Sequence, residues 1–278
     1  MRFGVALGRV NPQLWVTASE AADELGFDFM SLPEHLVVPV DISGSPTGGT
    51  HPPIDSSLPV FDVWVYIGFL AARTSRIRFG TYVYNLGLRH PFITARAVAT
   101  ADLLSAGRVD VGLGVSWLAE EWAAVGQDFR TRGRRFDETL DICRRLWTED
   151  VVEHHGEFFD FGRVRFEPKP VQRPMPLVIG GDAPVTIRRA ARVGAGWVPL
   201  QTPIAQLPSG IDRFREAWQA AGRDDAGVRV VRAMHHATGS DIAELEAMGV
   251  TDLVVAPWQR SPGAVTALEQ FAGEHIRR

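Results

Sequence analysis

Short apolar runs alternate with amphipathic segments along almost the whole chain. The clearest unit spans 77–121, where the apolar runs 77–84 and 109–115 flank a segment with apolar residues at helical spacing. Such a strand–helix–strand unit is typical of parallel sheets. The same pattern predicts strands over 2–8, 27–32, 77–84, 109–115, 176–180, 196–200, 228–234 and 252–256.

Amphipathic segments between these strands are expected to be helices. They begin and end at recognisable signals, such as Asn11-Pro12 before the first and Gly26 after it. Helices are predicted over 13–25, 62–73, 91–105, 118–125, 133–147, 184–193, 211–221, 241–248 and 263–272. Eight strands alternating with helices favour a (β/α)8 TIM barrel over an open doubly wound sheet. We therefore predict one α/β barrel domain over 1–278, an ordinary length for this fold.

Two stretches interrupt the alternation and are predicted to be insertions at the C-terminal face of the barrel. Residues 36–59 are rich in Pro, Gly and Ser and have no periodicity, which indicates a long loop and a candidate lid. Residues 148–175 form a second excursion, in which 155–170 resemble a β-hairpin rather than a barrel strand.

Composition narrows the possible partners. The formal net charge of −4 gives no indication of a nucleic acid or an anionic membrane as partner. No apolar run is long enough to cross a membrane, and the chain begins with a strand rather than a signal segment, so we expect a soluble protein. The one cysteine, Cys143, cannot form an intramolecular disulfide and lies at helical spacing among apolar residues, which fits a buried thiol in a cytoplasmic protein.

Polar, aromatic and glycine residues follow the predicted strands. Because the carboxyl ends of barrel strands meet at one mouth, these residues should converge there. Such a ring suits a ligand with a flat ring and an anionic tail. Its members are Glu34, His35, Tyr84, Asn85, Ser116, Trp117, Gly180, Gly181, Asp182, Gln201, Thr202, His235, His236, Trp258, Gln259 and Arg260.

Several common chemistries find no support in the sequence. No cluster of His, Cys and carboxylate residues has metal-ligand spacing, so we predict no metal site. No G-x-S-x-G motif is present, and Cys143 lies within a helix. Gly112, Gly114 and Ser116 resemble part of a dinucleotide fingerprint, but Trp117 stands where its third glycine should be.

The segment after the fifth strand could bind an anion. Gly180 and Gly181 end that strand, and the helix that follows offers backbone N–H groups to a phosphate. Arg188 and Arg189 could offset the charge of Asp182. The alternative is an ordinary tight turn in which Asp182 caps the helix.

Most of the chain resembles the luciferase-like monooxygenase superfamily, and within it the actinobacterial oxidoreductases that depend on the deazaflavin coenzyme F420. The matching segments are SLPEH (31–35), RIRFGTYVYNLGLRHP (76–91), ATADLLSAGRVDVGLGVSWLAEEWAAVG (99–126), TRGRRFDETLDICRRLW (131–147), FEPKPVQRPMPLVIGG (166–181) and AARVGAGWVP (190–199). The resemblance implies a barrel with an insertion after the third or fourth strand. It also implies a cis peptide bond between Tyr82 and Val83, at a bulge that backs the flavin-like ring.

The same resemblance assigns site residues. Glu34 and His35 match the acid–histidine pair beside the reactive ring, and His35 would either transfer a proton or shape the pocket. Asp182 departs from the small or hydroxyl residue expected at its position. Residues implied to bind the cofactor are Tyr82, Val83, Gly114, Val115, Ser116, Glu120, Ile179, Gly180 and Gly181.

Three functions follow from these observations. The first is transfer of a hydride between F420 and a small organic substrate, in either direction. The second is a two-component monooxygenase that uses FMN reduced by a separate reductase. The third is a barrel that binds a flavin or deazaflavin without catalysis. The resemblance also implies a homodimer, for which the apolar segment 63–72 is one candidate contact.

Overall fold

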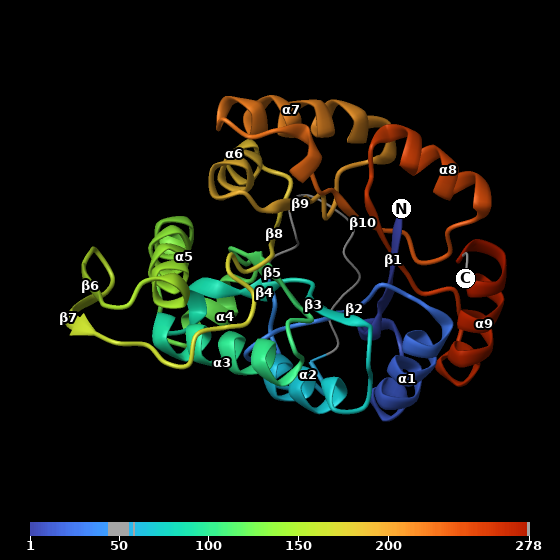
Figure 1. Ribbon diagram of the computed structural model, residues 1–278, viewed down its shortest axis with the longest axis horizontal. Coiled ribbons are helices and arrows are strands. Elements are labelled where there is room, and N and C mark those ends of the chain that lie inside the picture. Colours follow the sequence, from blue (N-terminus) through green and yellow to red (C-terminus); the bar gives the residue numbers. More distant parts are fainter. Residues whose placement is uncertain (44–55, 58, 277–278) are drawn as a thin grey trace.

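A computed structural model describes residues 1–43, 56–57 and 59–276. Its parallel strands follow one another around a ring in the order β10, β11, β1, β2, β3, β5, β8, β9. A parallel bridge between Trp197 and Val230 joins the last strand to the first, so the ring closes as predicted for a TIM barrel (Figure 1). The barrel strands are β1 (Arg2–Ala6), β2 (Phe29–Leu32), β3 (Arg78–Thr81), β4 (Tyr84–Asn85), β5 (Val109–Gly114), β8 (Leu177–Gly180), β9 (Gly196–Val198), β10 (Val231–Ala233) and β11 (Asp252–Val255).

Helices lie outside this ring and cover its strands (Figure 1). Their ends follow the sequence signals: Asp62 accepts hydrogen bonds from two backbone N–H groups at the start of α2, and Gly26 and Gly249 end α1 and α8 with positive φ. The helices are α1 (Trp15–Leu25), α2 (Val63–Ala71), α3 (Pro91–Leu104), α4 (Ala119–Ala124), α5 (Arg132–Thr148), α6 (Pro184–Val193), α7 (Leu207–Ala220), α8 (Gly239–Met248) and α9 (Ala264–His275).

The predicted elements are confirmed in kind and order, with different bounds at several ends. The largest difference is in the third strand, predicted as continuous over 77–84. The cis peptide bond between Tyr82 and Val83 divides it into β3, which pairs with β2 and β5, and β4, which pairs with β5 alone. The seventh strand is shorter than predicted, and α7 begins at Leu207 rather than at 211.

The excursion over 148–175 contains the expected hairpin. Strands β6 (Val152–His155) and β7 (Asp160–Val164) pair with each other and not with the barrel, and they project from the side that α5 covers (Figure 1). The Glu138 carboxylate on α5 fixes the turn by accepting hydrogen bonds from the backbone N–H groups of Phe158 and Phe159. Residues 44–55 and 58 of the predicted loop over 36–59 lie outside the described residues.

Charged side chains join the strands at the N-terminal end of the barrel. Arg78 donates two hydrogen bonds to Oδ1 of Asp110, at 3.0 and 2.6 Å. Arg229 contacts both Asp110 and Asp252 at 3.0 Å, and Arg2 also pairs with Asp252. Because these pairs lie at the opposite end from the carboxyl ends of the strands, we regard them as part of the scaffold.

Two other features bear on the chain as a whole. Cys143 is fully buried on α5, as predicted, and burial raises the pKa of its thiol. Within 1–43, 56–57 and 59–276, every helix is too short or too polar to cross a membrane.

Candidate active site at the mouth of the barrel

The interrupted third strand turns Val83 into the mouth of the barrel. An added Cβ at Gly114 would lie 2.6 Å from Cγ2 of Val83, and one at Gly180 would lie 3.0 Å from its Cγ1. Side chains on β5 and β8 would therefore fill the space that Val83 occupies. Thr81 holds the strand just before the cis bond by exchanging hydrogen bonds of 2.6 and 2.9 Å with the backbone of Gly112. The predicted cis bond and the close approach at Gly114 and Gly180 together define a bulge of fixed shape.

Glu34 is a buried carboxylate directly after β2. It accepts hydrogen bonds from the Asn85 N–H at 2.8 Å and from the Arg89 guanidinium at 2.5 Å. Arg89 also lies over the ring of Tyr84. Burial raises the pKa of Glu34 above its usual range, although Arg89 and the Asn85 N–H oppose that rise. Glu34 therefore ties the end of β2 to the segment after β4.

His35, the next residue, is held by a second buried carboxylate. Its Nδ1 lies 3.2 Å from Oε2 of Glu121, which is fully buried on α4. Burial alone would lower the pKa of His35, but the hydrogen bond and the charge of Glu121 outweigh burial and raise it. Among the described residues, Nε2 of His35 has no hydrogen-bond partner. This arrangement leaves one ring nitrogen available for proton exchange.

Glu121 organises the start of the loop after His35 as well. It accepts hydrogen bonds from the N–H groups of Leu36 at 2.6 Å and Val37 at 3.3 Å, and from the Asn85 side chain at 3.4 Å. Its neighbour Glu120 was predicted from the sequence as a site residue, whereas Glu121 was not. Helical spacing from the buried Leu118 to Glu121 and Trp122 was the available signal, because it places Glu121 on the inner face of α4.

Glu120 and Ser116 have local partners at the same edge. The Glu120 carboxylate accepts hydrogen bonds from the backbone and the hydroxyl group of Ser43. Ser116 has a φ of 68°, in the left-handed region, and its hydroxyl accepts a hydrogen bond from the N–H of Leu118. Val115 is partly buried against the core. These residues shape the turn from β5 into α4.

The turn after β8 differs from both sequence interpretations in detail. Asp182 does not cap α6; its carboxylate accepts hydrogen bonds from the backbone N–H groups of Gln201 and Thr202 and from the Thr202 hydroxyl. The Gly181 N–H donates to the carbonyl of Val198 at 3.0 Å. Arg189, which we expected to offset the charge of Asp182, instead donates hydrogen bonds to Asp137 at 2.8 and 2.9 Å.

The remaining predicted residues are Ile179, which is fully buried in the core, and Tyr82, which follows β3. Burial raises the pKa of the Tyr82 phenol, while the charge of Arg232 opposes that rise and the charge of Asp182 adds to it. The sequence analysis missed Arg89 and Arg232. Arg89 could have been identified from its position beside the predicted mouth. Arg232 had no such signal, because it lies inside a predicted strand.

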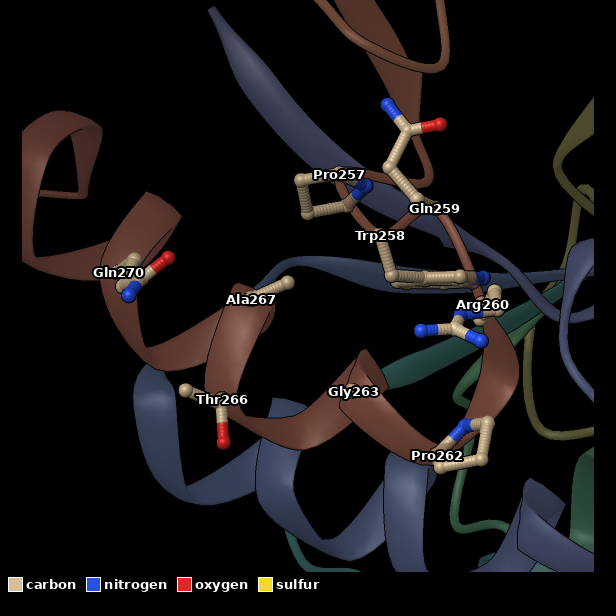
Figure 2. A pocket seen from close by; sticks show the side chains of 9 residues that line it. All are labelled: Pro257, Trp258, Gln259, Arg260, Pro262, Gly263, Thr266, Ala267 and Gln270. Atoms are coloured by element: carbon tan, nitrogen blue, oxygen red, sulfur yellow. The ribbon is translucent and has the colours of Figure 1, made fainter.

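A hollow of about 670 Å³ lies at one side of the mouth, between the segment after β11 and helix α9. Figure 2 shows that Trp258, Gln259 and Arg260 line it opposite residues of α9. The Trp258 indole N–H donates to the carbonyl of Arg9 at 2.8 Å. These three residues, expected at the mouth, follow β11 and line this hollow together with residues of α9. No group of three or more potential metal ligands occurs in the part of the chain that the structure describes.

A parallel barrel with an acid–histidine pair beside a cis bulge at its carboxyl end defines a class of enzyme. The chain belongs to the luciferase-like monooxygenase family, whose model matches residues 5–273. Membership makes it an oxidoreductase of the luciferase-like class.

Three known proteins illustrate the similarity. The uncharacterized protein Rv0940c of Mycobacterium tuberculosis is 30% identical over 291 residues, with 100% of both chains covered. An F420-dependent glucose-6-phosphate dehydrogenase of Segniliparus rotundus is 30% identical over 227 residues, covering 78% of this chain and 62% of that protein. The structure of an F420-dependent secondary alcohol dehydrogenase with an F420–acetone adduct aligns with a TM-score of 0.80 at 16% identity, covering 100% and 99% of the chains.

Proposed function

We propose that the protein transfers a hydride between coenzyme F420 and a small organic substrate. The observation that carries this proposal is the buried Glu121 carboxylate, which holds His35 beside the cis bulge with Nε2 of His35 unpartnered among the described residues. Bound F420 would supply the hydride chemistry. The chain would supply orientation, exclusion of water and a group that exchanges the substrate's proton.

The site residues fit a flat ring. The bulge at Tyr82 and Val83 would back the ring, because the absence of side chains at Gly114 and Gly180 lets Val83 stand in the mouth. The remaining residues proposed to line the cofactor are Val115, Ser116, Glu120, Ile179 and Gly181. Ile179 would act through packing, since its side chain is wholly within the core.

His35 would exchange a proton at Nε2 while Glu121 holds the opposite ring nitrogen. When an alcohol is oxidised, its O–H proton would pass to His35 as its C–H hydride leaves. When a carbonyl is reduced, protonated His35 would return that proton. Glu34 would act by positioning, because Asn85 and Arg89 already occupy its carboxylate oxygens.

FMN-dependent monooxygenation is the second candidate, favoured by the description of the family as luciferase-like monooxygenases. In that case a separate reductase would supply reduced FMN. Titration with F420 and, separately, with FMN, followed by quenching of ligand fluorescence, distinguishes the candidates. Tight binding of F420 with weak binding of FMN is expected, and the opposite preference would overturn the proposal. Binding of F420 without turnover of any acceptor would leave the third alternative, a non-catalytic barrel.

A homodimer is part of the proposal. Helices α2 and α3 expose apolar side chains at Val65 (73%), Phe69 (50%) and Leu104 (65%). The two helices pack together, since a Cβ at Gly68 of α2 would lie 3.5 Å from Leu104 of α3. A second copy of the chain would cover this surface. The single buried thiol, Cys143, agrees with a cytoplasmic setting.

A further inference from the structure

An arginine without an acidic partner lies within the barrel. Arg232 is the middle residue of β10, and its Nη1 donates to the carbonyl of Pro199 at 2.7 Å. Its Nε is buried and has no hydrogen-bond partner. Within the described part of the chain, no carboxylate lies at ion-pair distance from Arg232, whereas Arg78 and Arg229 both pair with aspartates. Because a buried N–H group normally has an acceptor, the Nε of Arg232 lacks a partner that the described residues do not supply.

The strand order shows where this side chain lies. In the ring of eight strands, β10 is four places from β3 in either direction, so the two strands face each other across the barrel. The charge of Arg232 nevertheless acts on the phenol of Tyr82, the residue that follows β3. The hydrogen bond to the carbonyl of Pro199, the residue after β9, places the guanidinium at the carboxyl end of the barrel, the end where His35 lies.

A second arginine and two histidines lie on the same side of the mouth. Arg9 is exposed after β1, and His235 and His236 follow β10. Burial, together with the charges of Arg9 and His236, lowers the pKa of His235 to about 4, so its ring is neutral near pH 7. Arg9 and Arg232 thus place positive potential on one side of the mouth.

Two acidic residues of the mouth, Glu34 and Glu121, have basic partners of their own. Arg89 pairs with Glu34, and His35 contacts Glu121. The carboxylate of Asp182 keeps its charge, but it is held by the segment after β9 and does not pair with Arg232.

We propose that Arg232 binds an anionic group, a carboxylate or a phosphate, inside the barrel mouth. Its forked donors suit either group. In the oxidoreductase proposed above, this group belongs to the substrate, and that assignment rests on the proposed function. His35 follows β2, which is three places from β10 around the ring, so the substrate would carry its anionic group away from the carbon that reacts.

Inorganic phosphate at constant ionic strength tests the anion site. Titration calorimetry on the full chain would compare the wild type with Arg232→Gln, Arg232→Lys and the control Arg213→Gln, which removes an exposed arginine from α7. We expect Arg232→Gln to weaken phosphate binding by at least about tenfold, because a charge-assisted contact is lost. Arg232→Lys should retain part of the affinity, and Arg213→Gln all of it. If Arg232→Gln does not fold, Arg232→Lys carries the comparison. Wild-type protein that binds no phosphate, or Arg232 variants within twofold of it, would overturn the site.

Repeating the titration with F420 identifies the source of the anion. Phosphate that still binds the F420-loaded protein, with the F420 affinity of Arg232→Gln within twofold of wild type, would support the substrate. Phosphate that competes with F420, with weaker F420 binding by Arg232→Gln, would overturn the substrate assignment and give the anion to the cofactor. A wild type that binds phosphate but not F420 would reject the proposed function and leave the anion site standing.

Discussion

His35 and Glu121 are 86 positions apart in the sequence, yet Nδ1 of the histidine lies 3.2 Å from Oε2 of the carboxylate. Glu121 is fully buried and also binds the backbone N–H groups of the next two residues after His35. The carboxylate therefore fixes both the ring of His35 and the direction in which the chain leaves β2. This dual role makes Glu121 the first residue to test.

Replacing Glu121 with Gln should lower the pKa of His35, because the hydrogen bond and charge that raise it are weakened. We also expect kcat to fall by about tenfold to a hundredfold as the ring loses its orientation. The pKa can be measured by NMR titration of the His35 ring. Glu120→Gln is the matched control for that titration, because Glu120 contacts Ser43 instead of His35. Equal His35 pKa values in both variants would exclude the positioning role.

His35→Ala should reduce kcat by at least about a hundredfold if His35 exchanges a proton with the substrate. In substrate oxidation the neutral ring accepts the proton. Because the pKa of His35 is raised, kcat/KM should increase with pH through a midpoint above its ordinary value of about 6.5. The reverse reaction needs the protonated ring and should decline over the same range. Steady-state rates across pH provide the measurement, and undiminished turnover would limit His35 to shaping the pocket.

The Gly114→Ala variant should be less stable than wild type by about 1–3 kcal/mol, because its Cβ would overlap Val83. Shortening Val83 to Ala in the same protein should restore most of that loss. Urea unfolding of the single and double variants measures the coupling. Gly162→Ala serves as the control, since nothing lies within 4 Å of a Cβ at that position. Additive effects of the two substitutions would show that Val83 does not need the space at Gly114.

Asp110→Asn should lower the free energy of unfolding by about 1–3 kcal/mol at neutral pH, because it removes the carboxylate that pairs with Arg78 and leaves Arg229 with Asp252 alone among the described residues. Burial alone would raise the pKa of Asp110, but these arginines outweigh it and lower the pKa. The stabilisation is therefore complete above the unfolded value of about 3.9 and is lost as pH falls through the lower folded value.

Chemical unfolding at several pH values would follow this difference. The difference in the free energy of unfolding between wild type and Asp110→Asn should become smaller below about pH 4. Asp212→Asn, an exposed change on α7, should leave stability unchanged at every pH. A constant difference in the free energy of unfolding across the acid range would contradict the role of the Asp110 carboxylate in these ion pairs.

Phe69→Glu should convert the proposed homodimer to a monomer, because it places a charge within the exposed apolar surface of α2 and α3. Light scattering during gel filtration measures the mass directly. Val171→Glu changes an equally exposed valine that lies outside both helices and should leave the mass unaltered. A wild-type monomer would remove the dimer from the proposal.

Periodicity was enough to predict the barrel, because each strand and helix has its own local signal. Gly26 and Gly249, for example, end helices through a backbone preference that any chain with glycine there would show. The division of the third strand had no local signal, and the cis bond at Tyr82 came from the family resemblance alone. The residues on either side of the interruption, Tyr82 and Val83, both favour strands, and the interruption depends on glycines in β5 and β8.

The acid–histidine pair was predicted, but the groups that hold it were only partly visible. Glu121 is one residue from the predicted Glu120, and only the inward face of α4 distinguishes them. Arg232 reads as a polar interruption in a short apolar run, and its significance depends on the absence of a nearby acid among the described residues. Sequence periodicity predicts the face of an element on which a side chain lies. The partners of that side chain on other elements can be identified only once the barrel is closed.

The charged residues at the N-terminal end also favour one register of the strands when the barrel closes. Arg2, Arg78, Asp110 and Asp252 belong to four different strands, and Arg229 precedes a fifth. Side chains alternate between the two faces of a strand. A slip of one residue would therefore turn one charged side chain outward and leave its partner unpaired in the interior. A register shifted by one residue is therefore less stable than the correct one. The ion pairs at this end of the barrel thus favour the strand alignment that also positions the residues at the distant mouth.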